Sequence, residues 1–139
     1  MRIRFLGATR QVTGSSYFLD AGGLKVLIDC GLFQERDYSY RNWEGFPVPP
    51  NQIHCLLLTH VHLDHSGLIP KLVKEGFAGD ILLTPPSKEM FPIVISDSAR
   101  IQEEDAAFKK SATIGKAEQD HTQKSLCIPS GMPKSVFPF

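Results

Sequence analysis

The segment Thr-His-Val-His-Leu-Asp-His-Ser-Gly at residues 59–67 constrains this chain more than any other part of it. It follows directly on an apolar run at residues 53–58, which is typical of a buried strand. Four side chains of the kinds that bind metal ions lie within six consecutive residues: His60, His62, Asp64 and His65. The pattern therefore predicts a metal-binding loop at the end of a buried strand.

The spacing of these residues indicates two metal positions. His60 and His62 are two residues apart and project to the same side of an extended chain, so they can share one ion. Asp64 and His65 follow where the chain turns into a helix, and they can serve a second ion. Imidazole and carboxylate ligands suit zinc, and manganese or iron less exclusively. The alternative, a set of scattered surface residues, does not account for such a dense cluster.

Two neighbouring metal ions would give this loop a hydrolytic chemistry. A metal-bound water has a pKa of about 7, so it supplies hydroxide at neutral pH. Two ions roughly 4 Å apart can hold both the nucleophile and the oxygen of the group under attack. Asp64 is the candidate catalytic carboxylate, because it can orient that hydroxide or take its proton.

Asp29 is the second candidate catalytic carboxylate. It ends the apolar strand expected at residues 24–29, at an edge where strand ends would line a site. Either it hydrogen-bonds a ligand histidine and steadies the motif loop, or it is an ordinary carboxylate in a turn. Spacing alone does not separate these alternatives. His54 and His121 belong to no motif, and we expect both to be structural or surface residues.

The rest of the chain predicts an α/β protein. The hydrophobic share of 42% is enough for a buried core. A hairpin closed by Ala21-Gly22-Gly23 is expected to join two strands. Ser87 is a candidate N-cap for a long second helix. The predicted strands cover residues 2–6, 16–20, 24–29, 53–58 and 80–84, the predicted helices cover 67–77 and 88–110, and an irregular loop covers 34–52.

Composition excludes several classes of protein. Fifteen basic and fifteen acidic residues balance, so no global positive field recruits nucleic acid, and any such binding must come from a local patch. The three cysteines are odd in number and lack C-x-x-C spacing, which argues against a disulfide framework. The apolar stretch at the N-terminus is too short and too interrupted for a signal peptide, and there is no apolar run of about 18 residues, so we expect neither a leader nor a transmembrane helix. These features predict a cytoplasmic protein without a membrane partner.

The pattern His-x-His-x-Asp-His after a buried strand resembles the metallo-β-lactamase superfamily. Four further segments resemble its β-CASP branch, the branch of the cleavage-and-polyadenylation nucleases: residues 12–15, 27–34, 65–70 and 97–106. The resemblance covers about residues 2–110. It implies an αββα sandwich with an inserted β-CASP domain, two zinc ions, and RNA, or in some branches DNA, as the substrate.

The resemblance also implies roles for individual residues. Asp29 corresponds to the first family motif, which supports the metal ligands. His60, His62, Asp64 and His65 correspond to the second motif. Glu103, Glu104 and Asp105 would stand at the start of the inserted domain. The other ligand residues of the family, a further histidine and a bridging aspartate among them, have no counterpart in this sequence.

We therefore expect the N-terminal half of the sandwich together with the start of the insert at residues 1–110. An irregular tail is expected at 111–139. Shifted by one base and with suitable codons, residues 124–139 can read as a family-like continuation, which suggests a frameshift; a natural short paralogue is the alternative. Sandwich surfaces without their partner would favour association with a second copy.

Three functional hypotheses follow. The first is a metal-dependent RNA nuclease of the β-CASP type, incomplete in this chain. The second keeps the metallo-hydrolase but assigns it DNA or a small ester as substrate. The third is a catalytically inactive remnant, or a binding and assembly module.

Overall fold

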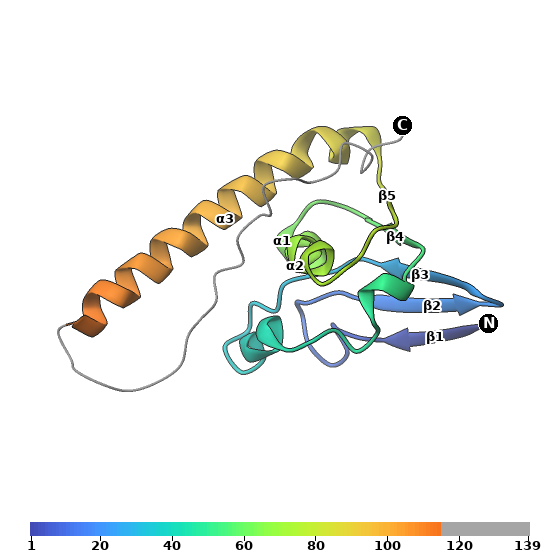
Figure 1. The fold of residues 1–139 in the computed structure, drawn as a ribbon, viewed down its shortest axis with the longest axis horizontal. Coiled ribbons are helices and arrows are strands. Elements are labelled where there is room, and N and C mark those ends of the chain that lie inside the picture. Colours follow the sequence, from blue (N-terminus) through green and yellow to red (C-terminus); the bar gives the residue numbers. More distant parts are fainter. Residues whose placement is uncertain (115–139) are drawn as a thin grey trace.

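A five-stranded mixed sheet forms the centre of the protein (Figure 1). The computed structural model describes residues 1–114, and the side chains of residues 1–108. The strands lie side by side in chain order, the first three antiparallel and the last three parallel. They are β1 (Arg2–Phe5), β2 (Tyr17–Ala21), β3 (Leu24–Ile28), β4 (Cys55–Leu57) and β5 (Asp80–Leu82). All five predicted strands are confirmed, each with slightly different bounds.

One face of the sheet carries the core. The pairing aligns Phe18, Leu27, Leu56 and Ile81 in a row across four strands, and all four are buried. Because side chains alternate between the faces of a strand, this row points to a single side. Residues 27 and 56 also belong to continuous apolar runs, as expected for parallel strands inside an α/β protein.

Three helices pack on that face (Figure 1). They are α1 (Leu63–Ser66), α2 (Ile69–Lys74) and α3 (Pro85–Ile114). Ile69 and Leu72 from α2, with Phe91 and Ile95 from α3, join the sheet residues in one hydrophobic cluster. Figure 1 shows the later part of α3 running outward, away from the sheet.

The predicted start of the long helix was wrong. It begins at Pro85, so Ser87 lies inside the first turn and is not the N-cap. The Lys88 N–H already donates to the Thr84 carbonyl, and the Thr84 hydroxyl lies 3.1 Å from the Ser87 hydroxyl. Proline is tolerated at the first positions of a helix, which explains how the helix can begin on two prolines. The helix is described as far as Ile114, which is four residues into the irregular tail expected at 111–139, and the rest of that tail lies outside the described residues.

The loop expected at 34–52 is irregular but firmly held. It contains two short 3₁₀ turns, at Ser39–Trp43 and Pro50–Gln52. The buried Asn42 side chain bonds the Phe33 main chain in both directions, at 2.8 Å each. The buried Lys71 of α2 donates to the carbonyls of Asn42 and Glu44. These bonds fix the loop against the helical face, because buried polar groups must find partners.

The opposite face of the sheet is apolar and much more exposed. Ile3 and Phe5 of β1 are 53% and 66% exposed, and Leu57 of β4 is 41% exposed. By register, Tyr17 and Ile28 continue the row between Phe5 and Leu57. The expected apolar surface is therefore present, whereas association through it stays a prediction. Among the described residues, none of the helices has the length and apolarity needed to cross a bilayer.

Adjacent leucines in β4 test this two-faced arrangement. Leu56 is fully buried, so Leu56→Ala should lower the free energy of unfolding by about 2–5 kcal/mol. Leu57→Ala removes the same atoms from the exposed face and should cost less than about 1 kcal/mol. Guanidinium unfolding followed by circular dichroism measures both. Equal losses would mean that the Leu57 face is covered in solution.

Candidate metal centre

The metal-type residues lie at one edge of the sheet because two parallel strands end there. The chain leaves β3 at Asp29 and leaves β4 at Leu58 and Thr59. The Asp29 N–H donates to the Leu57 carbonyl at 2.9 Å, which holds the two strand ends together. The carboxyl ends of parallel strands are the usual place for a site in α/β proteins. Asp29 and the motif loop are thereby brought within hydrogen-bonding distance.

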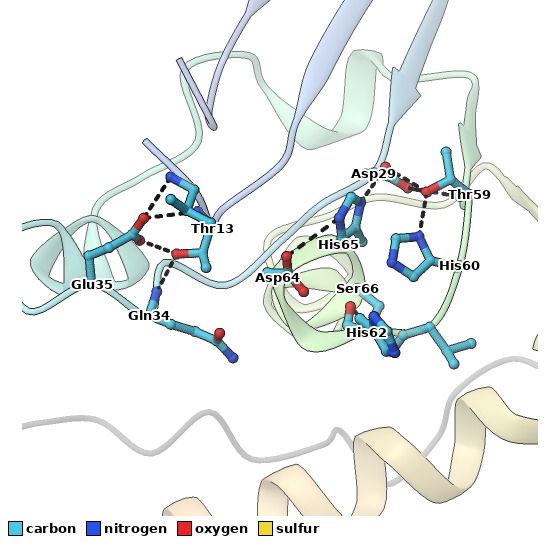
Figure 2. Close-up of polar contacts among 12 residues, drawn as sticks. Thr13, Asp29, Gln34, Glu35, Thr59, His60, His62, Asp64, His65 and Ser66 are labelled. Carbon is cyan, nitrogen blue, oxygen red and sulfur yellow. Dashed lines mark hydrogen bonds and ion pairs between the residues drawn. The ribbon is translucent and has the colours of Figure 1, made fainter. Parts of the chain in front are cut away.

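Asp29 anchors the motif loop. Its side chain is buried, and its φ of 58° lies in the left-handed region, an uncommon conformation for a residue other than glycine. Oδ1 accepts the Thr59 N–H at 2.8 Å, and the Thr59 hydroxyl lies 3.0 and 2.9 Å from the two carboxylate oxygens. Oδ2 lies 2.8 Å from Nδ1 of His65. The carboxylate therefore joins both ends of the motif loop (Figure 2).

These bonds set the tautomers of two histidines. A carboxylate can only accept, so Nδ1 of His65 carries the hydrogen and Nε2 keeps its lone pair. The single hydroxyl hydrogen of Thr59 also goes to Asp29. The Thr59 oxygen must then accept from Nδ1 of His60, 3.0 Å away. One buried carboxylate thus directs the Nδ1 hydrogens of both His60 and His65 inward, and turns Nε2 of His65 toward Asp64, whose Oδ2 lies 3.5 Å away.

The predicted ligand residues form a tight group (Figure 2). The His60 ring centroid lies 4.8 Å from that of His62 and 4.0 Å from that of His65. Asp64 Oδ2 lies 3.5 Å from Nε2 of His65. Partial burial, together with the His65 and His62 rings, lowers the pKa of His60. This favours the neutral imidazole, which is the form that binds metals.

The donor types suit zinc, but the described residues do not enclose an ion by themselves. Among them, no three histidine, cysteine, aspartate or glutamate side chains form a group that could hold a metal. A closed zinc site needs four ligands, so the assignment of His60, His62, Asp64 and His65 as ligands stays a prediction.

A short helix shapes the second half of the motif. His62 is extended, with ψ of 145°, and α1 begins at the next residue. The Ser66 hydroxyl donates to the carbonyls of Val61 and His62, at 2.9 and 3.1 Å. Asp64 falls in the first turn, where a negative charge interacts favourably with the helix dipole. The change from extended chain to helix places Asp64 and His65 beside the preceding histidines.

Main-chain hydrogen bonds connect the motif to Ser15, Cys30 and Gly31, three residues that the sequence analysis did not assign to the site. The Ser15 N–H donates to the Asp64 carbonyl at 2.8 Å, and the Gly31 N–H donates to the Ser15 carbonyl at 3.0 Å. The Cys30 N–H donates to the His65 carbonyl at 2.7 Å. The sequence signal that could have indicated this contact is the glycine at position 31. A Cβ there would lie 1.7 Å from the Asp64 carbonyl oxygen, so only glycine fits.

Other polar candidates have structural roles. Nδ1 of His54 accepts from the Lys25 N–H at 3.0 Å, and the main-chain N–H of His54 donates to the Lys25 carbonyl, so His54 joins two neighbouring segments of the sheet. This agrees with its expected structural role, whereas His121 lies outside the described residues. Burial strongly raises the pKa of the Cys30 thiol, which therefore stays protonated and unreactive.

Comparison with known proteins identifies the family. The family model described as "Metallo-beta-lactamase superfamily" matches residues 9–110, which include Asp29 and the whole motif. The chain belongs to the metallo-β-lactamase superfamily. A ribonuclease of Thermus thermophilus, TTHA0252, is 43% identical over 104 residues, and a transcription termination factor FttA of Methanosarcina mazei is 34% identical over 99 residues. The resemblance to the β-CASP branch and the mixed α/β fold class are confirmed.

This metallo-β-lactamase domain matches only a part of its relatives. The matched region is 75% of the chain but 24% of the Thermus ribonuclease, and 70% of the chain but 16% of the archaeal factor. Among solved structures, a Cronobacter sakazakii metallo-β-lactamase with a HARLDQ motif aligns with a TM-score of 0.47 and 24% identity. That alignment covers 63% of this chain and 30% of the other.

Two glycines test how closely the site is packed. Gly31→Ala forces a methyl group against the Asp64 carbonyl, so it should destabilise the domain by about 1–3 kcal/mol and displace the motif loop. Gly45→Ala is the control, because an added Cβ there meets no atom within 4 Å. Thermal unfolding and amide NMR shifts of residues 60–66 report both effects. A Gly31→Ala spectrum that overlays that of Gly45→Ala would contradict the close approach.

Replacing Asp29 tests the control of the tautomers. In Asp29→Asn, an amide N–H facing His65 Nδ1 should move the ring hydrogen to Nε2 and so remove the free lone pair. Nitrogen-15 shifts of the imidazole rings at a pH where they are neutral distinguish the two tautomers. Asp37→Asn is the control, because Asp37 is exposed and distant in sequence from the motif. An unchanged His65 tautomer would show that Asp29 does not set it.

Proposed function

We propose that this domain is part of a metal-dependent hydrolase of the β-CASP type that cleaves phosphodiester bonds in RNA. The observation that carries the proposal is the Asp29 carboxylate bound to His65, beside the His60 and His62 rings. It is supported by the 43% identity over 104 residues to a ribonuclease, and by the family match over residues 9–110, which hold these side chains. RNA is preferred over DNA or a small ester because the first of these relatives is a ribonuclease.

Each residue of the group has a proposed role. His60 and His62 would hold one zinc ion through free imidazole nitrogens, and Asp64 with His65 would hold the second. When bound, two such ions supply a hydroxide nucleophile and stabilise the charge that develops on the phosphate. Asp64 would orient the attacking water, and Asp29 would keep the ligand rings oriented, which its contacts with His65 and Thr59 support. The ligands that complete the site would come from outside the described residues.

The proposal includes the setting of the domain. Residues 1–110 would form the first half of the αββα sandwich and the start of the β-CASP insert, which α3 leads into. The exposed sheet face would pack against the second half, or against another copy of this chain where that half is absent. The described cysteines, Cys30 and Cys55, are free thiols, which supports a cytoplasmic location.

A second function is favoured by one observation. Because no three described side chains form a metal-holding group, this chain alone could serve as an inactive binding or assembly module. The two functions differ in their dependence on metal. A module would bind its partner equally well with or without a chelator, whereas a chelator would abolish RNA cleavage by the hydrolase.

Histidine variants in the complete 139-residue chain test the hydrolase. We expect zinc uptake, measured by elemental analysis, and chelator-sensitive cleavage of a labelled single-stranded RNA. His60→Ala should reduce cleavage by more than about a hundredfold, since even groups that only support a metal ligand contribute up to that amount. His54→Ala is the matched control, because His54 bonds to Lys25 and not to the motif. Zinc-free protein without cleavage would reject the hydrolase in favour of the module.

A further inference from the structure

Glu35 binds a distant loop with both oxygens of its carboxylate (Figure 2). Oε1 accepts the N–H groups of Val12 and Thr13 at 2.8 and 2.9 Å. Oε2 accepts from the Thr13 hydroxyl, whose oxygen in turn accepts the Gln34 N–H at 2.8 Å. These bonds lower the pKa of Glu35 to about 2, so the carboxylate is charged at neutral pH. Hydrogen bonds to a charged acceptor are the stronger kind.

The loop that Glu35 binds, residues 8–14, has a main-chain conformation that contacts from other segments must stabilise. Ala8 and Arg10 both have a positive φ, at 52° and 59°, which costs energy for residues other than glycine. Gly14 also has a positive φ, of 78°, and a Cβ there would meet the Phe33 ring at 2.5 Å. A strained main-chain conformation of this kind persists only when contacts with the surrounding structure hold it in place. Glu35 and Phe33 supply those contacts from the segment that follows Asp29.

The same loop touches the candidate metal centre. Ser15, two residues beyond Thr13, donates its N–H to the carbonyl of Asp64 and receives the N–H of Gly31. The connection therefore runs from the Glu35 carboxylate through Thr13 and Ser15 to the main chain of a predicted metal ligand. Figure 2 draws the Glu35–Thr13 pair to the left of Asp64.

We propose that Glu35 is a positioning residue: by clamping Val12 and Thr13 it holds Ser15 against Asp64 and so fixes the direction of the Asp64 carboxylate. The inference rests on the proposed function in so far as Asp64 binds a metal ion, whereas the connection from Glu35 through Thr13 and Ser15 to Asp64 does not depend on that function. A merely structural clamp would stabilise the loop without influencing the motif. The two roles are separated by a measurement at the site itself.

Three variants of the complete chain provide that measurement. Glu35→Ala removes all three bonds. Glu35→Gln retains one oxygen for the two N–H groups and should restore part of the effect. Glu89→Ala removes an exposed carboxylate of the same length from α3 and serves as the control. The probes are Zn²⁺ affinity from competition with a chromophoric chelator, the visible spectrum of bound Co²⁺, and amide hydrogen exchange at Ser15.

We expect Glu35→Ala to weaken zinc binding by about tenfold, the lower end of the effect of removing a group that orients a metal ligand. It should also shift the Co²⁺ spectrum and speed exchange at Ser15. Glu35→Gln should lie between Glu35→Ala and the unmodified chain. Zinc affinity and Co²⁺ spectrum equal to those of Glu89→Ala would overturn the proposal, even if the melting temperature falls.

A further outcome separates this proposal from the proposed function. If the unmodified chain binds no zinc, the metal-dependent function fails. Glu35 is then judged by exchange at Ser15 and by the amide shifts of residues 62–66. Faster exchange and displaced amide shifts in Glu35→Ala, without such changes in Glu89→Ala, support the positioning role. Exchange and shifts in Glu35→Ala that equal those of Glu89→Ala reject it.

Discussion

The structure of the candidate site depends on one buried carboxylate. Asp29 adopts a left-handed conformation at the end of β3, and from there it binds Thr59 at the start of the motif loop and His65 in α1. A buried charge is stabilised when its oxygens are bonded, so these contacts favour the closed conformation of the loop. The same bonds orient the rings of two candidate ligands. The packing of the loop and the orientation of the rings therefore depend on the same carboxylate.

The packing of the sheet positions the edge at which β3 and β4 end. Helices cover one face, and Leu27 and Leu56 fix the two strands whose ends deliver Asp29 and Thr59. The other face presents Ile3, Phe5 and Leu57 to solvent. In a sandwich such a face packs on a second sheet. This agrees with a chain that spans about a quarter of the Thermus ribonuclease it matches.

Most of the elements could be predicted from local pattern, and the errors have physical causes. Apolar runs marked the strands, because burial on a sheet leaves a strong periodic signal. The start of α3 was misplaced because Ser87 is a good N-cap by propensity, whereas the chain already turns at Thr84. Glu35 and Ser15 were not assigned to the site, since neither belongs to the metal-ligand pattern and their hydrogen bonds form only in the folded chain.

The sequence by itself determined the family, the ligand-type residues and the strand that carries them, because these are properties of short contiguous segments. Tertiary structure decided which atoms meet. Asp29 and His65 are 36 positions apart, and spacing left open whether that carboxylate supports the motif or merely ends a strand. Only the parallel pairing of β3 with β4 brings the two within 2.8 Å, because long-range register depends on the packing of the whole sheet.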